Sequence, residues 1–311
     1  MPSFPGSDVF QGEIHHSSEH SDSAAYAGKT CVVVGSNTSA HDISRALWEA
    51  GAAVTMVQRS ATCVCKSEAL LKGLEDLYSE RAVANGITTD EADLLFASTP
   101  YRLLPTSQTP IYAEIARDDA EFYRDLAEAG FLLDFGDDGR KDGIFMKYLR
   151  RGSGYYIDVG ASQFIIDKKI KLESGTEVER LTENSVKLKS GKELPADLVV
   201  LATGYGPMIG WAEKLISKDV ADIVGPIWGL GAGTRGDPGP FEGELRNMWK
   251  PTKQPGLWFH GGNLHQARHY SKFLALQLKA RFEGIPTNVY ISRSSTGSGD
   301  APSPRGAEEA L

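Results

Sequence analysis

Residues 29–57, KTCVVVGSNTSAHDISRALWEAGAAVTMV, decide the fold. Residues 29–34 form a β-branched run without alternation, which is typical of a strand buried on both faces of a sheet. Residues 38–50 repeat apolar side chains at helical spacing, and Gly51 supplies the helix stop. A second buried strand at 53–57 follows at once. The stretch therefore predicts a β-α-β unit with a right-handed crossover, parallel strands and an α/β fold.

The turn between the first strand and the helix, GSNTSA, is a G-x-N-x-x-A variant of a dinucleotide-binding pattern. A glycine lets the strand turn sharply, a residue that tolerates positive φ lets the backbone approach a pyrophosphate, and a small third residue lets helix and strand pack closely. Asn37 is expected to take that positive φ, since Asn visits the left-handed region more readily than most residues. The helix N-terminus favours phosphate. The predicted dinucleotide contacts are Gly35, Ser36, Asn37, Thr38 and Ser39, although an ordinary tight strand-to-helix turn would read much the same.

Arg59 and Ser60 follow the second strand, about where an NAD enzyme carries an acid for the ribose. A guanidinium with a neighbouring hydroxyl suits the 2′-phosphate of NADPH, which a carboxylate would repel. The pair therefore predicts a preference for NADPH, with a solvated surface arginine as the alternative.

The composition excludes several classes of protein. A net charge of -8 over 311 residues, without a local Lys/Arg cluster, gives no field that would hold nucleic acid. No apolar run approaches the roughly 20 residues of a bilayer span, and the first twelve residues lack the pattern of a secretory signal, so the expected compartment is the cytoplasm. Three cysteines fit neither a disulfide framework nor a metal site, and Cys31 is predicted to be a buried strand residue.

The N-terminal two thirds of the chain divide by composition. Residues 1–27 are rich in Ser, His, Gly and Pro and are expected to form a lead-in loop, with order beginning at Gly28. Residues 61–160 mix Pro/Thr loops with helical patterns at 67–77 and 111–129, and are expected to form a largely helical insertion.

The C-terminal part begins with strand patterns that predict a β-meander followed by one more central strand, at 170–172, 177–181, 185–188 and 198–201. The last of these strands runs into Thr203 and Gly204, where small residues would let a cofactor lie close to the backbone. We expect loops over 204–256, a short strand at 257–260 and a helix at 267–283. Residues 291–311 should be a disordered tail.

Four segments in this order, VVVGSNTSAHDI, VTMVQRS, LVVLATGY and GLWFHGGNLHQARHYS, resemble the flavin-containing monooxygenase family. Within it, the run MKYLRRGSGYYIDVGASQFI is similar to a fungal and bacterial, YUCCA-like branch. The resemblance covers about residues 1–290. It implies a Rossmann-like NADP-binding domain at 28–205 and the C-terminal part of a second, FAD-binding domain at 206–290.

The resemblance also implies roles for single residues. Gly262 and Asn263, which open the last helix, would lie beside the flavin ring; Asn263 reads equally well as a helix N-cap. Phe10, Gly12 and His16 match an F-x-G-x-x-x-H lead-in of the family. The next position of that motif is His20 rather than Trp, which favours the heteroatom-oxidising or YUCCA-like type over the Baeyer-Villiger type.

The implied activity is a monooxygenation in which NADPH reduces FAD and one oxygen atom is transferred to a small organic substrate, so that the cofactor carries the hard chemistry and no catalytic side chain is named. No G-x-G-x-x-G turn precedes Gly28, so we expect a truncated member in which FAD binding is weak or lost. A non-catalytic NADP-binding fragment and a flavin-free NADPH dehydrogenase stay open. So do a homo-oligomer and a separate chain that supplies the FAD domain.

Overall fold

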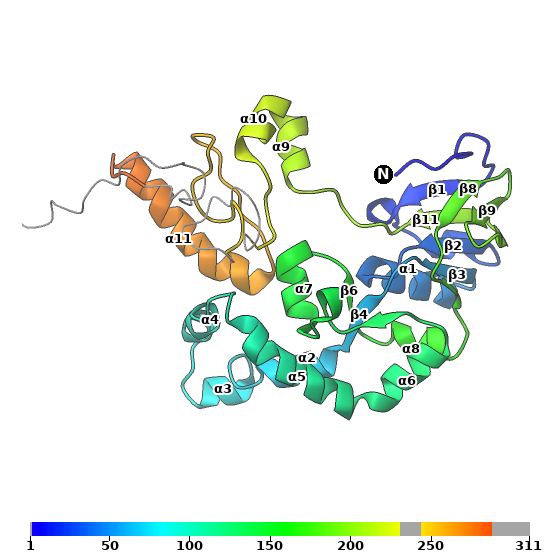
Figure 1. Ribbon diagram of the computed structural model, residues 1–311, viewed down its shortest axis with the longest axis horizontal. Coiled ribbons are helices and arrows are strands. Elements are labelled where there is room, and N and C mark those ends of the chain that lie inside the picture. Colours follow the sequence, from blue (N-terminus) through cyan, green and yellow to red (C-terminus); the bar gives the residue numbers. More distant parts are fainter. Residues whose placement is uncertain (1, 231–243, 288–311) are drawn as a thin grey trace, which may run out of the picture. The chain divides into compact units, whose positions relative to one another are not determined.

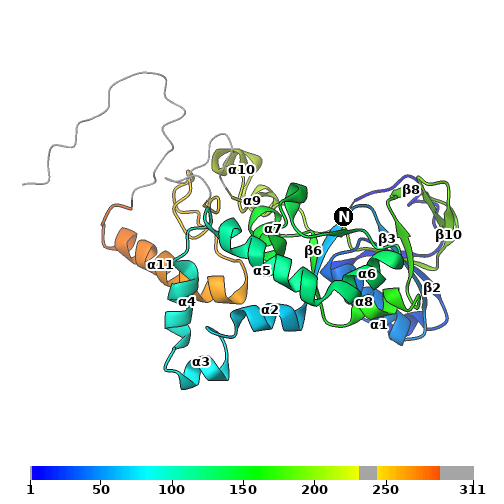
Figure 2. The ribbon, with the colours of Figure 1, turned by 60° about the horizontal axis from the view of Figure 1, so that its bottom comes forward.

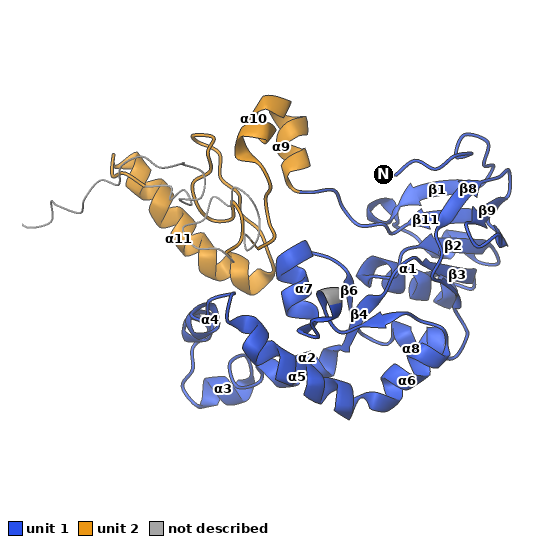
Figure 3. Ribbon diagram, in the orientation of Figure 1, with its two compact units in different colours: residues 1–207 blue, residues 208–311 orange. Residues whose placement is uncertain are grey.

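The computed structural model describes residues 2–230 and 244–287, and the chain divides into two compact units, residues 1–207 and 208–311 (Figure 3). The predicted disordered tail at 291–311 lies outside the described residues. Each unit is described by itself.

A five-stranded parallel sheet forms the centre of the first unit, in the order β1-β11-β2-β3-β7. Its strands are β1 (Glu13–His16), β2 (Thr30–Val34), β3 (Ala53–Gln58), β7 (Lys171–Ser174) and β11 (Leu198–Leu201). The predicted β-α-β unit and its parallel strands are confirmed. The expectation of a loop before Gly28 is wrong at β1, because these four residues gain a full set of partners on β11.

Three layers result, as Figures 1 and 2 show. Helices α1 (Thr38–Glu49) and α8 (Ala161–Ile166) cover one face of the sheet. An antiparallel sheet of β8 (Val178–Leu181), β9 (Ser185–Leu188) and β10 (Glu193–Pro195) covers the other. The predicted meander is confirmed for these strands. Its expected first strand near 170–172 is wrong in its pairing, because β7 joins β3 in the parallel sheet.

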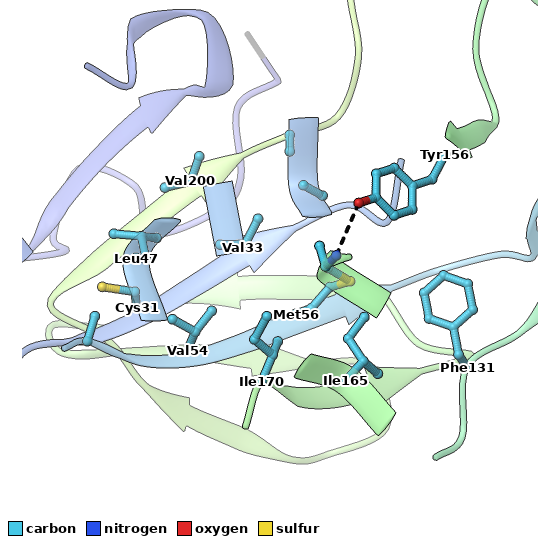
Figure 4. Packing of buried hydrophobic residues seen from close by; sticks show 14 of the residues in the cluster. Cys31, Val33, Leu47, Val54, Met56, Phe131, Tyr156, Ile165, Ile170 and Val200 are labelled. Atoms are coloured by element: carbon cyan, nitrogen blue, oxygen red, sulfur yellow. Dashed lines mark hydrogen bonds between the residues drawn. The ribbon is translucent and has the colours of Figure 1, made fainter. Parts of the chain in front are cut away.

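Alternating side chains of the central strands build two separate cores. Val33 and Val200 pack with Leu47 of α1, whereas Val32 and Val199 pack against the antiparallel sheet. Figure 4 shows the helical side of this arrangement, with Val33, Met56 and Ile165 among the labelled residues. Because β2 and β11 are buried on both faces, they are apolar without alternation, as a central parallel strand requires.

The insertion between β3 and β7 contains a second parallel sheet that the sequence reading missed. Strand β4 (Thr62–Lys66) pairs with β5 (Leu133–Asp134) on one side and β6 (Tyr155–Asp158) on the other. Six α-helices accompany it: α2 (Ser67–Leu74), α3 (Glu80–Ala84), α4 (Thr89–Ala97), α5 (Leu104–Asp118), α6 (Ala120–Glu128) and α7 (Gly143–Arg151). In both ribbon views α3 and α4 lie at the end of the first unit away from the antiparallel sheet.

One helix predicted over 111–129 is in fact two. Asp119 separates α5 from α6 with a non-helical backbone (φ -100°, ψ 24°), and its carboxylate accepts a hydrogen bond from Lys66 at 2.7 Å. Aspartate competes for backbone hydrogen bonds and is a poor interior helix residue, which favours a break here. Three short 3-10 helices complete the first unit, at Ser17–Glu19, Ala24–Tyr26 and Asp137–Gly139.

The second unit contains three helices within 208–230 and 244–287: α9 (Ile209–Leu215), α10 (Lys218–Val224) and α11 (Leu264–Phe282). The predicted loop over 204–256 is wrong at α9 and α10, the second of which is capped by Ser217. The predicted strand at 257–260 is also wrong, since only a single bridge joins Phe259 to Met248. The last predicted helix is confirmed as α11. None of the helices in the described part of the chain is long and apolar enough to span a membrane.

Candidate functional site

The first candidate site is the turn that follows β2. Gly35 has φ +132°, and a Cβ placed on it would lie 2.2 Å from the carbonyl oxygen of Ala202. Its N–H donates to the Val57 carbonyl at 2.9 Å. Only glycine fits between the ends of β11 and β3, so the predicted glycine turn is present. After this turn the chain continues to β3 on one side of β2, whereas β11 lies on the other side of β2. Open α/β sheets bind ligands at such a topological switch point.

Helix α1 begins at this turn without a side-chain cap. Asn37 is the N-cap residue, but its side chain accepts no hydrogen bond from the first turn. Its backbone is extended (φ -94°, ψ -169°), so the expected positive φ at Asn37 is wrong, and the conformational demand falls on Gly35 alone. The first-turn amides of Thr38 and Ser39 therefore lack a capping partner from Asn37, an arrangement that suits an anion.

A hydroxyl network lies beneath the turn. Ser36 is 8% exposed, and its Oγ lies 2.8 Å from Oγ1 of Thr62, which is itself buried at the start of β4. Thr62 also donates to Oδ1 of Asn37 at 3.5 Å. The buried Ser36 hydroxyl thus faces the protein, so that its backbone remains for a ligand, whereas the Asn37 side chain is partly exposed. The contact of Thr62 with this turn was not predicted from the sequence, because Thr62 lies at the start of a strand of another sheet and no local motif indicates such a contact.

His41, one turn into α1, is fully buried and stacks on Tyr156 with ring centroids 3.9 Å apart. Burial lowers the pKa of His41 to about 4, so the ring is neutral at neutral pH. Its Nδ1 lies 3.2 Å from the Asn37 carbonyl oxygen. The first turn of α1 therefore has no ionised histidine, and His41 acts as a packing residue rather than an acid or base.

Arg59 and Ser60 lie just beyond β3 and are exposed, as residues that contact the 2′-phosphate of a coenzyme must be. Arg59 lies 4.0 Å from the carboxylate of Glu177, and Glu177 also binds Lys189. A carboxylate beside Arg59 was not predicted, because Glu177 is remote from Arg59 along the chain.

Thr203 and Gly204 follow β11 at the same edge of the sheet as Gly35. His16, at the end of β1, has its Nε2 3.0 Å from the Gly204 carbonyl oxygen and its ring edge-on to Tyr205. Gly204 has φ +83°. The structure therefore brings His16 of the lead-in motif to the predicted Thr203-Gly204 corner.

His20, the residue at which the lead-in motif departs from its family pattern, is part of a short hydrogen-bonded chain. Its Nδ1 lies 3.0 Å from Nε2 of His15, whose Nδ1 lies 3.1 Å from Glu13. On its other side, His20 Nε2 lies 2.9 Å from the Ser23 hydroxyl. Burial lowers the pKa of His20, and the group helps to order the lead-in segment.

Gly262 and Asn263 belong to the second unit. Asn263 caps α11, with its Oδ1 accepting from the Gln266 N–H at 2.9 Å, so the N-cap reading is confirmed. Gly262 has φ +91°. Their predicted place beside a flavin stays a prediction.

The cysteines have no reactive role in this arrangement. Cys31, Cys63 and Cys65 are all free and buried, which confirms Cys31 as a strand residue. Burial raises the pKa of Cys31 to about 11 and those of Cys63 and Cys65 to about 12, so the thiols stay protonated at neutral pH. Over residues 2–230 and 244–287, no three His, Cys, Asp or Glu side chains are arranged to hold a metal ion.

Comparison with known sequences gives one matching family and several related monooxygenases. The family described as flavin-binding monooxygenase-like matches residues 1–73. FAD-containing monooxygenase EthA of Mycolicibacterium smegmatis is 29% identical over 241 residues, 72% of this chain and 44% of that protein. Probable indole-3-pyruvate monooxygenase YUCCA10 of Arabidopsis thaliana is 27% identical over 215 residues, 68% of this chain and 47% of that protein. The chain thus spans about half the length of these relatives.

Solved structures agree on the fold. The open crystal structure of cyclohexanone monooxygenase matches with a TM-score of 0.53 and 15% identity, over 91% of this chain and 60% of that one. Its cyclohexanone-bound structure in the Rotated conformation gives 0.51 and 16%, with the same coverage. At such identities the likeness concerns the fold alone, and it confirms the predicted α/β class.

Proposed function

We propose that this chain, which is similar to flavin-containing monooxygenases, belongs to that family and that its first unit binds NADPH for a flavin-dependent monooxygenation of a small organic molecule. The reaction would be of the heteroatom-oxidising or YUCCA-like type. The observation that carries the proposal is the Gly35 turn, where α1 begins without a side-chain cap at the switch point of the parallel sheet.

The turn fits the pyrophosphate of a dinucleotide in two respects. Gly35 permits the sharp turn because an added Cβ would clash with the Ala202 carbonyl oxygen, and the amides of Thr38 and Ser39 can donate to phosphate oxygens. Arg59 and Ser60, at the end of the next strand, are the proposed contacts of the 2′-phosphate. Thr203 and Gly204 of the first unit are proposed contacts of a bound cofactor, and Gly262 and Asn263 of the second unit are proposed to lie beside a flavin.

FAD, when bound, would accept a hydride from NADPH and use O₂ to oxygenate the substrate. The residues of this chain would position the coenzyme and keep its ring in contact with the Thr203-Gly204 corner.

A second candidate is an NADP-binding protein without oxygenase activity, because the Gly35 turn that would hold the dinucleotide lies wholly within the first unit. The two candidates differ in the visible absorption of the purified protein after FAD is added. Retained flavin absorption with NADPH oxidation supports the monooxygenase. Nucleotide binding without retained flavin supports the second candidate.

The test of coenzyme binding is a fluorescence titration of wild type and Arg59→Ala with NADPH and NADH. A charge-assisted contact to phosphate contributes about 1.5 kcal/mol at the lower end, so we expect about a ten-fold weaker NADPH affinity in the variant. NADH affinity should hardly change. Arg180→Ala, which removes another exposed arginine of the same unit, is the control. Equal wild-type affinities for the two coenzymes would contradict the assignment of Arg59.

A further inference from the structure

The carboxylate of Glu177 lies beside Arg59, and Glu177 also pairs with Lys189; no sequence motif indicates either contact. Strand β3 pairs with β7 so that Gln58 faces Ser174, and the Gln58 carbonyl accepts the N–H of Gly175 at 2.8 Å. Because Arg59 follows Gln58 directly, this pairing fixes it next to the segment that leads into β8. Glu177 stands on that segment.

Glu177 lies between two cations. Its Oε2 lies 4.0 Å from Nη1 of Arg59, and its Oε1 accepts a hydrogen bond from Nζ of Lys189 at 2.5 Å. The backbone fixes Lys189 as well, since its N–H donates to the Glu177 carbonyl at 2.9 Å across the hairpin. The hydrogen bond from Lys189 lowers the pKa of Glu177, so the carboxylate is ionised at neutral pH. An anion already occupies the position between Arg59 and Lys189.

We infer that Glu177 and Lys189, together with Arg59, set the choice between nucleotides that carry a 2′-phosphate and nucleotides that do not. The inference rests on the proposed binding of NADPH at the Gly35 turn. A 2′-phosphate that approaches Arg59 must displace Glu177 and gains Lys189 as a second cation. Glu177 therefore opposes the phosphorylated nucleotide, and Lys189 favours it.

The expected change in nucleotide affinity follows from how exposed the two side chains are. The side chains of Glu177 and Lys189 are 40% and 62% exposed, so water and salt screen their charges. Exposed pairs of this kind change an equilibrium about two- to five-fold. The opposite signs expected for the two residues make the inference testable despite this modest size.

The probes are adenosine 2′,5′-bisphosphate and 5′-AMP, which differ only in the 2′-phosphate, titrated against the whole chain by calorimetry at low salt. Glu177→Gln should bind the bisphosphate about two- to five-fold more tightly and 5′-AMP with unchanged affinity. Lys189→Gln should bind the bisphosphate more weakly by a similar factor. Glu179→Gln is the matched control, because Glu179 is also an exposed acid of this hairpin but pairs with Lys187, at 3.6 Å.

The outcomes separate the inference from the function on which it rests. If the wild type binds both probes and Glu177→Gln leaves the ratio of affinities unchanged, the inference is overturned and the proposed function stands. An equal gain in Glu179→Gln would also overturn it, because net charge alone would then explain the effect. If the wild type binds neither probe, the proposed function fails and the inference fails with it. Far-ultraviolet circular dichroism confirms that each surface variant is folded.

Discussion

Gly35→Ala tests whether the turn after β2 depends on a backbone that only glycine provides. The added Cβ would face two separate penalties. A side chain at φ +132° costs about 1 to 3 kcal/mol in backbone strain, and contact with the Ala202 carbonyl oxygen, 2.2 Å away, costs about 1 to 3 kcal/mol through overpacking. We therefore expect the free energy of unfolding to fall by about 2 to 6 kcal/mol.

Gly51→Ala is the matched control at the other end of α1. Gly51 also has a positive φ, +92°, but a Cβ there would meet no atom within 4 Å. Its cost should be the conformational penalty alone, about 1 to 2 kcal/mol. Urea unfolding followed by far-ultraviolet circular dichroism gives both values. Equal destabilisation by the two substitutions would refute the argument that the ends of β2 and β11 are packed too closely for a side chain.

Two further predictions concern buried charge. Burial lowers the pKa of His41 from its usual value of about 6.5 to about 4. The folded protein therefore binds fewer protons than the unfolded protein below about pH 6.5, and stability present at pH 7 is lost as the pH falls towards 4. In urea titrations, His41→Phe should lose about 2 kcal/mol less than wild type between pH 7 and pH 5; the same loss in both proteins would refute the assignment. Lys147, which is 4% exposed, forms an ion pair with Asp134. Lys147→Met should cost about 3 kcal/mol or more in thermal or urea unfolding, because Asp134 loses its partner, whereas Lys169→Met at an exposed pair should cost about 1 kcal/mol or less. Equal losses in the free energy of unfolding for the two substitutions would show that burial does not strengthen the Lys147–Asp134 pair.

The parts of the fold that sequence reasoning found are those with strong local signals. The β-α-β unit combines a buried apolar run, a glycine turn and a helical period within 29 residues, 29–57. Strands β1 and β5 were missed because pairing with β11 and β4, rather than a local pattern, makes them strands. Helices α9 and α10 are seven residues each, too short for a clear period.

The candidate site was predicted in the same uneven way. Gly35 could be identified from its neighbours, since the turn and both flanking elements are contiguous. Glu177 could not, because it reaches Arg59 only through the pairing of β3 with β7. The positive φ predicted for Asn37 was wrong because Gly35 takes the positive φ at this turn, whereas Asn37 has an extended backbone.

The strand order has a consequence for how this protein is made. Strand β11 lies between β1 and β2, yet it leaves the ribosome after every other strand of that sheet. Until then β1 has no neighbour in the sheet and one edge of β2 is open, so a nascent chain exposes backbone donors and acceptors of the kind that recruit other chains. Pairings over such long stretches of sequence form slowly. The first unit therefore completes its sheet only after β11 has been made, and until then the preceding strands depend on the β2-α1-β3 unit, which is the part that can fold from local contacts.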